Sequence, residues 1–363
     1  MIRRSQVKGK CEILWARMER KPFAALIGII FALLVPLEAE ANPYLAKAGE
    51  RPVAVRIATC AVSGGFTHLY AGLDNKIFDK YGLKLELIYI RGSGASLAAL
   101  SANEIQFLFC AADATIPGMA TGIEAKLVAT PLVGLPYVLV ARKDIKRPED
   151  LKGKSIGVTR PGDLSARLSR AVLKKFNLTT EEVLLRSIGG SQSERYQAMV
   201  ADIIQAILVT PPLEVRAKND GFNVVYRLAE MDLPFVYSSL HTNSKMIRGQ
   251  LETVQRTVAA FAESIQFVEK NPDKAKASLA KALKLKDQEA LESAYNAYAK
   301  EIVNRSMLVP IQAVTESVEI ARESGTAIRK KAEEIVDNSF ATQLEKSGFL
   351  KDLWGSDLQK RPK

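Results

Sequence analysis

After residue 52, apolar residues recur with the spacing of short strands and of helices in turn. Alternating apolar positions predict a strand at Ser155–Thr159, and the apolar residues of Leu164–Phe176 fall at 164, 168, 172, 173 and 176, the spacing of a helix. Residues 160–163 between them form a turn with proline and glycine, where Asp163 or Ser165 is placed to cap the helix. Such a turn leaves backbone N–H groups unpaired at the helix start, which suits a small polar or anionic ligand.

This strand–loop–helix unit is predicted repeatedly along the chain. The predicted strands are 53–59, 83–90, 105–109, 127–131, 137–142, 155–159, 183–187, 205–209, 223–226 and 233–242. Their alternation with helices favours an α/β fold with largely parallel sheets. Glycine-rich or small-residue loops follow at least four strands, at 63–67, 92–96, 160–165 and 189–193. Because ligands bind outside the carboxyl ends of strands in such sheets, these loops predict a cleft between two lobes.

From Gly249 onward the pattern predicts helices without strands. Apolar residues from Leu251 to Val268 repeat at spacings of three and four, typical of one long amphipathic helix. Further helices are predicted at 273–283, 287–304, 310–330 and 332–346. We expect them to cover the first lobe, with a partner-binding helical surface as the alternative.

The N-terminal residues have the order of an export signal. Glu19-Arg20-Lys21 precede the apolar run Pro22–Leu37, and Ala39-Glu40-Ala41 follows as a cleavage site. We predict cleavage after Ala41 and a periplasmic location. The apolar run is shorter than the ~20 residues of a membrane span, and retention as an anchor is the alternative. A start at Met18 instead of Met1 stays open.

Composition adds the size and charge of the protein. The chain has 363 residues, of which 47% are hydrophobic and 25% charged, enough for two lobes with cores of their own. Its formal charge of +11 falls to +8 for the residues after 41, where the excess is spread without a dense patch. A solvated basic surface explains this spread, and nucleic-acid binding is not indicated. The predicted divisions are 1–41 signal peptide, 42–142 lobe 1, 143–238 lobe 2, 239–346 helical return to lobe 1, and 347–363 tail.

Cysteine and histidine are scarce. Cys11 lies in the predicted signal, and Cys60 and Cys110 each close a predicted strand. We expect two buried free thiols; a disulfide is the alternative, because export permits one, although bridges between adjacent parallel strands are often strained. His68 and His241 are far apart in the sequence, so no metal site is predicted, and we expect His68 to be a half-buried structural residue.

Catalytic motifs do not appear in the sequence. There is no G-x-S-x-G elbow and no phosphate-binding Walker loop, and G-x-G-x-x-G is absent. Asp113 and Asp163 lie in loops of the right kind for acid–base work, but a carboxylate that caps a helix or orders a loop is the commoner use. We therefore predict no catalytic residue and no cofactor.

Four stretches together resemble one family. They are GSGASLAALSANEIQF at 92–107, IGVTRPGD at 156–163, SERYQAMVADIIQAILVTPPLEVRAKNDGF at 193–222 and IVDNSFATQLEKSGFLKDLW at 335–354. In order and spacing they resemble the NMT1/THI5-like substrate-binding proteins of ABC importers, which include sulfonate-, nitrate- and taurine-binding members. Ala201-Asp202 departs from the family, which more often has Gly followed by Asp-Ala.

The resemblance implies a two-lobed periplasmic binding protein of the second structural type, with two hinge crossovers and a helical C-terminal cover. It implies ligand contacts from five loops and from Tyr237 near the hinge. The candidate ligand-binding residues are Ser63, Gly64, Phe66, Thr67, Ser93, Gly94, Ser96, Asp113, Arg160, Gly162, Asp163, Ser165, Thr210, Pro211 and Tyr237. Among them we expect the hydroxyl groups to replace ligand hydration, Phe66 and Tyr237 to cover apolar parts, and Arg160 to pair with an anion.

The implied function is delivery of a small polar or anionic molecule to an ABC permease by a monomeric binding protein. A thiamine-precursor pyrimidine, an alkanesulfonate, a nitrate-like anion and an aromatic acid all remain open as ligands. One alternative is an enzyme on the same scaffold, of the pyrimidine-synthase or menaquinone-pathway type, although the Cys-rich motif of the synthases is not seen here. A sensor that presents ligand to a membrane receptor is another.

Overall fold

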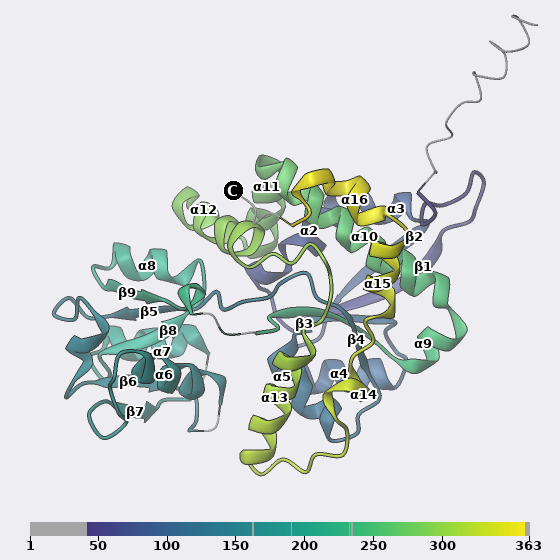
Figure 1. Ribbon diagram of the computed structural model, residues 1–363. Helices are drawn as coiled ribbons and strands as arrows, with labels where there is room; N and C mark the ends of the chain where they lie inside the picture. Colours follow the sequence, from purple (N-terminus) through teal and green to yellow (C-terminus); the bar gives the residue numbers. More distant parts are fainter. Residues whose placement is uncertain (1–41, 162, 190, 232, 234, 360–363) are drawn as a thin grey trace, which may run out of the picture. The chain divides into compact units, whose positions relative to one another are not determined.

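The computed structural model describes residues 42–359 except 162, 190, 232 and 234 (Figure 1). The predicted export signal, Cys11 and Gly162 lie outside the described residues. The strands of the described part form two five-stranded sheets. We call each sheet with its flanking helices a lobe.

The first sheet has the strand order β2-β1-β3-β10-β4. Its strands are β1 (Val53–Thr59), β2 (Leu83–Tyr89), β3 (Phe107–Ala111), β4 (Lys126–Ala129) and β10 (Ser238–Thr242). β1 pairs in parallel with β2 and β3, while β10 runs antiparallel between β3 and β4. β10 is buried along its whole length, as a central strand covered on both faces should be.

The second sheet repeats this arrangement with the order β7-β6-β8-β5-β9. Its strands are β5 (Val138–Ala141), β6 (Ser155–Val158), β7 (Leu184–Ser187), β8 (Ala206–Val209) and β9 (Asn223–Arg227). β6 pairs in parallel with β7 and β8, and β5 runs antiparallel between β8 and β9. Each sheet therefore receives one antiparallel strand, β5 or β10, immediately after the chain has crossed from the other lobe.

The placement of β5 corrects one prediction. The segment 137–142 was assigned to the first lobe, but β5 pairs with β8 and β9 of the second sheet. Its sequence, VLVA, is fully buried, and such an apolar run suits a central strand of either sheet. The strand predicted to return within 233–242 does join the first sheet, as β10. The other lobe boundaries remain predictions.

Helices connect the strands and cover both sheets. In the first lobe they are η1 (Gly64–Phe66), α2 (Thr67–Asp74), α3 (Ile77–Lys80), α4 (Ser93–Ser101) and α5 (Ala112–Ala120). In the second they are η2 (Pro148–Leu151), α6 (Leu164–Lys175), α7 (Gln192–Val200), α8 (Leu213–Asn219) and η3 (Leu228–Glu230). The later helices are α9 (Ser244–Gly249), α10 (Leu251–Lys270), α11 (Pro272–Leu283), α12 (Gln288–Asn296), η4 (Ala297–Glu301), α13 (Ile311–Glu323), α14 (Ala332–Ile335), α15 (Ser339–Lys346), α16 (Phe349–Trp354) and η5 (Gly355–Asp357).

Most of the helical C-terminal part packs on the first lobe, as expected, but α12 packs on α8 of the second lobe, where Lys218 pairs with Glu289. The predicted stripe of α10 is buried from Val254 to Val268, whereas its first member, Leu251, is 59% exposed. The ring of Phe261 lies 5.3 Å from that of Phe78 and 4.9 Å from that of Phe109. α10 also contacts α2, α15 and α16 (Figure 1). The helix predicted at 332–346 is broken into α14 and α15, because Val336 between them forms a bridge with Leu127 of β4.

Three segments meet where the chain crosses between the lobes. Gly134 N–H donates to the Phe235 carbonyl at 2.8 Å, and Tyr237 N–H donates to the Leu132 carbonyl at 3.1 Å. Val133 N–H donates to the carbonyl of Ile302, just after η4, also at 2.8 Å. The two crossovers are thus paired with each other and tied to the helical C-terminal part.

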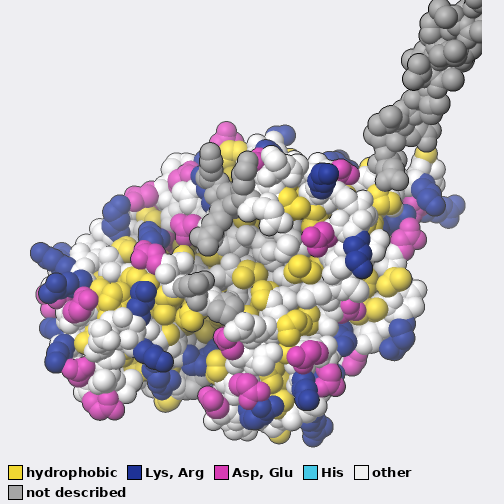
Figure 2. Space-filling view, in the orientation of Figure 1, with side chains coloured by type: hydrophobic (Ala, Val, Ile, Leu, Met, Phe, Trp, Pro, Cys, Tyr) yellow, Lys and Arg dark blue, Asp and Glu magenta, His cyan; other side chains and the backbone are white. Residues whose placement is uncertain are grey.

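The surface agrees with the predicted spread of charge. On the face shown in Figure 2, Lys and Arg side chains are interspersed with Asp and Glu. Among the described helices, none combines the length and apolar character needed to cross a bilayer. Within the same residues, no cluster of three or more His, Cys, Asp or Glu side chains is arranged to hold a metal ion.

Candidate functional site

A cavity of about 580 Å³ opens at the carboxyl ends of strands from both sheets. Asp113 follows β3 of the first sheet, and Thr159, Asp163 and Ser165 follow β6 of the second. The full lining is Ser93, Asp113, Ala114, Pro117, Tyr137, Thr159, Asp163, Leu164, Ser165, Arg167, Gln192, Arg195, Leu208, Ser317, Ile320, Ala321, Ser324 and Thr326. We call this space the anion cavity, for the reason given next.

Two arginines from second-lobe helices face this cavity. Arg195 of α7 is only 5% exposed, and its guanidinium donates to Thr159 Oγ1 at 2.8 Å. Arg167 of α6 is half-buried in the same lining. Burial lowers the pKa of both side chains from its usual value, because the charged form loses water. Both stay charged at neutral pH, so the cavity holds two poorly hydrated cations.

The capping of the two helices fixes where these arginines lie. α7 begins with a capping box in which Ser191 accepts from Glu194 N–H and the Glu194 carboxylate accepts from Ser191 N–H. At the start of α6, Ser165 Oγ accepts from Thr159 N–H at 2.9 Å and donates to Thr159 Oγ1 at 3.2 Å. The Asp163 side chain makes no capping hydrogen bond, although it occupies the capping position. Thr159 therefore links both helix starts to the end of β6.

The first lobe adds a carboxyl group to the cavity. Asp113 lies in the first turn of α5, and burial raises its pKa to about 6, while the nearby Arg167 opposes the rise. Tyr137 lines the same cavity, and burial together with the Asp113 charge raises its pKa well above the usual value. The lining of the cavity thus combines two guanidinium groups with the carboxyl groups of Asp113 and Asp163.

Replacing Asp113 with asparagine is expected to stabilise the ligand-free protein at pH 7. A pKa raised from 3.8 to about 6 means that the folded state binds more protons than the unfolded state between those values, so stability falls as pH rises through this window. The variant lacks this penalty and should gain on the order of 3 kcal/mol in unfolding free energy at pH 7. Urea denaturation at pH 7 and pH 4 measures it; a gain that persists at pH 4 would show that the cause is not this titration.

Three tyrosines form the wall between the lobes. The ring of Tyr237 stacks on that of Tyr298 at 5.8 Å and meets that of Tyr137 edge-on at 6.4 Å. The Tyr298 hydroxyl donates to the Pro211 carbonyl at 3.1 Å. These rings come from both crossovers and from η4, so all three lie where the chain passes between the lobes. Tyr237 therefore lies at the second crossover, and its contact with a ligand near a hinge stays a prediction.

Gly64 and Gly94, both predicted ligand contacts, differ in the space around them. A Cβ on Gly64 would lie 2.5 Å from Cε2 of the buried Tyr298 ring, whereas a Cβ on Gly94 meets no atom within 4 Å. We expect Gly64→Ala to lower the unfolding free energy by about 1–3 kcal/mol, because the ring has no room to move. Gly94→Ala, inside α4, should cause no loss. Thermal denaturation of the pair compares them; equal stabilities would contradict a rigid wall.

The predicted ligand-binding residues in loops and helix starts lie in four different places in the structure. Ser93, Asp113, Asp163 and Ser165 line the anion cavity. Ser63, Gly64, Thr210 and Pro211 line a second cavity of about 520 Å³, which shares Gln192 with the first. Phe66, Thr67 and Ser96 are buried in the first lobe, and Gly94 and Arg160 are exposed away from the lining of either cavity.

The three buried residues have structural partners. Phe66 packs on Phe109 with ring centroids 5.3 Å apart. Thr67 Oγ1 donates to the Gly64 carbonyl at 2.6 Å, and Ser96 Oγ bonds to the carbonyls of Gly92 and Ile90 at 2.8 and 3.0 Å. These hydroxyl groups hold the loops in place, and a ligand contact from them stays a prediction.

The sequence analysis did not identify the two arginines of the anion cavity. Arg167 and Arg195 lie inside helices, whereas the predicted ligand contacts come mainly from loops. It also took the 310–330 helix for a cover, yet Ser317, Ile320 and Ala321 of α13 reach the cavity. A signal for Arg195 was present: it follows Gln192 by three positions and precedes the buried Met199 by four, so the three share one helix face.

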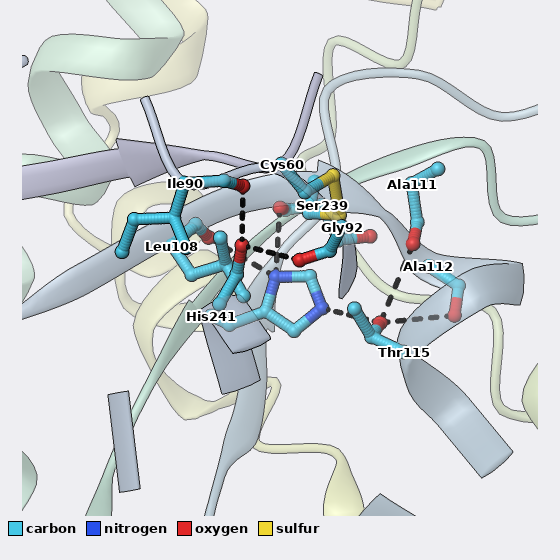
Figure 3. Close-up of a disulfide and its surroundings, with 11 residues drawn as sticks. Cys60, Ile90, Gly92, Leu108, Ala111, Ala112, Thr115, Ser239 and His241 are labelled. Atoms are coloured by element: carbon cyan, nitrogen blue, oxygen red, sulfur yellow. Dashed lines mark hydrogen bonds between the residues drawn. A yellow bond between two sulfur atoms is a disulfide. The ribbon is translucent and has the colours of Figure 1, made fainter. Parts of the chain in front are cut away.

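The cysteines correct another expectation. Cys60 and Cys110 form a disulfide with their Cα atoms 5.5 Å apart, instead of the two free thiols expected (Figure 3). The reason is the register of two neighbouring parallel strands, in which Thr59 pairs with Phe109 and sets the next residue of each strand side by side. The Cys60 carbonyl accepts from Gly92 N–H at 3.1 Å, so the bridge also supports the loop that carries Ser93.

Both histidines are fully buried. His241 Nδ1 lies 3.0 Å from the carbonyls of Leu108 and Ser239, and Nε2 lies 2.8 Å from Thr115 Oγ1 (Figure 3). Burial lowers its pKa to about 4, so the neutral ring donates from Nδ1 and accepts from Thr115, which fixes the start of α5 near Asp113. His68 is 0% exposed instead of half-buried, and burial lowers its pKa to about 3.

A larger cavity of about 770 Å³ lies beside the crossovers. It is lined by residues 133–135 and 229–231, by 300–306 and by the C-terminal segment, and it contains none of the predicted site residues. The anion cavity is the stronger candidate because it lies at the strand ends and gathers buried charges.

Comparison with known proteins gives one family and one fold. A model of the NMT1/THI5-like family matches residues 63–275, more than half of the chain. A protein of Brachyspira hyodysenteriae, provisionally named an ABC transporter periplasmic binding protein, is 26% identical over 220 residues. That alignment covers 56% of this chain and 62% of the relative, so the chain spans less than two thirds of the relative's length.

Two solved structures share the fold at low identity. The alkanesulfonate-binding protein SsuA of Xanthomonas axonopodis pv. citri, bound to MOPS, superposes with a TM-score of 0.63 at 15% identity, covering 80% of this chain and 100% of its own. The periplasmic aliphatic sulphonate binding protein SsuA of Escherichia coli also has a TM-score of 0.63, at 16% identity, covering 78% of this chain and 91% of its own. The two-lobed α/β architecture expected from the sequence is thereby confirmed.

Proposed function

Because the chain belongs to the NMT1/THI5-like family and has the fold of periplasmic binding proteins, we propose that it is an exported solute-binding protein that closes two lobes around a small organic anion and delivers it to an ABC importer. The name of the Brachyspira relative supports the importer, and the predicted export signal supports the location. N-terminal sequencing of the exported protein tests that location, and we expect it to begin at Asn42.

The observation that carries the proposal is the pair Arg167 and Arg195 in the anion cavity. A guanidinium group that has lost water gains most from a carboxylate, sulfonate or phosphate, which accepts two parallel hydrogen bonds. Both groups come from helices that begin at the carboxyl ends of second-lobe strands, where α/β sheets bind ligands. The first lobe faces them with Ser93, Asp113 and Ala114. An anion held by the second lobe is thus covered by the first.

Closure would use the paired crossovers as the hinge. The hydrogen bonds of Gly134 with Phe235 and of Tyr237 with Leu132 join the two crossovers close to the tyrosine wall. Hinge motions of this kind concentrate backbone change in a few residues between rigid lobes. Burial of a bound anion against Arg195 and Tyr137 would exclude water and strengthen the ion pair.

Among the ligands left open by the sequence, organic sulfonates and carboxylates suit this site best. A neutral pyrimidine brings no negative charge to the two guanidinium groups, whereas a sulfonate can accept charge-assisted hydrogen bonds from them. The alkanesulfonate-binding protein with the same fold was solved with MOPS, itself a sulfonate, which makes MOPS a natural probe.

A thermal-shift screen tests the proposal. The purified protein is heated with ethanesulfonate, MOPS, benzoate, nitrate and an uncharged aminopyrimidine. At about 100 times its dissociation constant, a ligand adds about 2.7 kcal/mol to the unfolding free energy. We expect a shift with at least one organic anion; a shift with the pyrimidine alone, or with none of the compounds, would contradict an organic-anion site.

The enzyme alternative finds no support in the placement of the cysteines. Cys60 and Cys110 are joined to each other and do not line the anion cavity, so neither supplies a thiolate there. Mass spectrometry of each stabilising compound after long incubation with the protein checks for turnover, and we expect the compound to be recovered unchanged.

A further inference from the structure

The second cavity, of about 520 Å³, shares Gln192 with the anion cavity. The first lobe contributes Val62, Ser63 and Gly64 to it, and the second lobe contributes residues on both sides of the Pro211-Pro212 peptide. Its lining is Val62, Ser63, Gly64, Gln192, Ser193, Thr210, Pro211, Pro212, Leu213, Arg216, Asn219, Leu283, Leu285, Asp287 and Ala290. We call this space the tail cavity.

We propose that the tail cavity binds the apolar end of the ligand, so that the cognate solute is an elongated organic anion whose head lies between Arg167 and Arg195 and whose alkyl or aryl tail passes Gln192. This inference rests on the proposed function, since it assumes an anion in the first cavity. It adds a second subsite and a requirement for length, which the charge of the first cavity alone does not impose.

The apolar character of the tail cavity is the first argument. Val62 is 56% exposed in the loop between β1 and η1, and Leu213, Leu283 and Leu285 are half-buried. These side chains come from three separate parts of the fold: the loop after β1, the start of α8 and the end of α11 with its following turn. Aliphatic groups that converge on one hollow from three elements gain free energy when an apolar tail displaces water.

Gln192 gives the second argument, because it joins the two cavities. It is the first residue of α7 and lines both of them. Its Oε1 accepts from Thr210 N–H at 2.8 Å and from Thr210 Oγ1 at 3.2 Å, which fixes the carboxamide against the loop after β8. Gln192 is therefore the residue that a ligand spanning both cavities would contact.

The charges of the tail cavity argue against a second anion there. Arg216 is its one basic lining residue, and its guanidinium carbon lies 5.2 Å from the centre of the Tyr196 ring. It also pairs with Asp220 at 3.7 Å, and Asp287 adds a carboxylate to the lining. The tail cavity thus has one guanidinium group where the anion cavity has two, so the charged head belongs in the anion cavity and the uncharged part of the ligand in the tail cavity.

Calorimetric titration with linear alkanesulfonates from two to eight carbons tests the inference on the purified protein. We expect affinity to rise about two- to fourfold for each methylene once the tail reaches the cavity. The variant Val62→Gln with Leu285→Gln should flatten this rise and leave the affinity for ethanesulfonate unchanged. Leu184→Gln, at a 60% exposed leucine of β7 outside both cavities, is the matched control and should keep the rise.

The outcomes separate the two levels of the proposal. If ethanesulfonate binds and affinity does not depend on chain length, the tail subsite is wrong while the anion site stands. If the rise survives unchanged in the double variant, the tail lies elsewhere and the assignment is also overturned. If no chain length binds, and alkanoates of matching length also fail, the proposed function and the tail subsite fall together.

Discussion

Replacing Arg195 with glutamine is expected to weaken binding of the cognate anion by roughly 10- to 150-fold, the equivalent of about 1.5–3 kcal/mol for hydrogen bonds to a charged group. Arg195 is 5% exposed, and Thr159 Oγ1 engages one end of its guanidinium. Glutamine keeps much of the length and polarity of the side chain and removes the charge. The loss should therefore appear in ligand affinity more than in folding, and calorimetric titration with the compound found in the screen measures it.

Arg195→Lys separates charge from geometry. Lysine restores the positive charge but not the planar pair of donors, so we expect it to recover only part of the affinity. Full recovery by lysine would mean that a point charge is sufficient and that the ligand is not held by two parallel hydrogen bonds.

Arg160→Gln is the matched control, because Arg160 was the anion partner chosen from the sequence. Arg160 is exposed and absent from the lining of both cavities, so its replacement should change affinity less than twofold. A large loss at Arg160 together with none at Arg195 would restore the sequence-based assignment and refute the structural one.

The alternation of strands and helices was predictable because strands and helices each have their own spacing of apolar residues. The buried positions of α10 follow the three-and-four spacing read from the sequence, and most strands lie within two residues of their predicted ends. The sheet to which a strand belongs was not predictable in this way. β5 is apolar at every position, and only its partners, β8 and β9, place it in the second sheet.

For the candidate site, the sequence predicts which loops meet at the cavity. It does not predict which charged side chains face that cavity. The loops after β3 and β6 do meet at one cavity, as parallel strands with aligned carboxyl ends require. Which helical residues face that cavity depends on how each helix is rotated against its sheet. Arg160 and Arg167 are both basic residues near the same loop, but Arg160 lies exposed in the turn before α6, while the packing of α6 brings Arg167 near Asp113.

The bond between Cys60 and Cys110 depended on register in the same way. The two residues are 50 positions apart, and the sequence gives no reason for them to be opposite each other until β1 and β3 are paired at Thr59 and Phe109. Strand β3 also ends two residues later than predicted, so that Cys110 belongs to the strand itself. Once both facts are known, a disulfide is the natural state in an oxidising compartment.

Removing this bridge is the change expected to cost the folded protein most. A cross-link that closes a loop of about 50 residues restricts the unfolded chain by about 4 kcal/mol in the chain-entropy treatment. We therefore expect Cys60→Ala with Cys110→Ala to lower the unfolding free energy by about 3–4 kcal/mol in urea denaturation. Because the substitutions also remove two sulfur atoms from packed surroundings, the variant alone does not isolate the cross-link.

Reduction of the unmodified protein separates the effect of the cross-link from the effect of lost packing. Dithiothreitol leaves every atom of the packing in place and opens only the bridge, so it should lower the urea midpoint of the unmodified protein and leave that of the double variant unchanged. Thiol titration of the exported protein, unfolded without reductant, should find no free thiol before reduction and two after it. Two free thiols at the outset, or a midpoint indifferent to dithiothreitol, would show that β1 and β3 are held by their hydrogen bonds and packing alone.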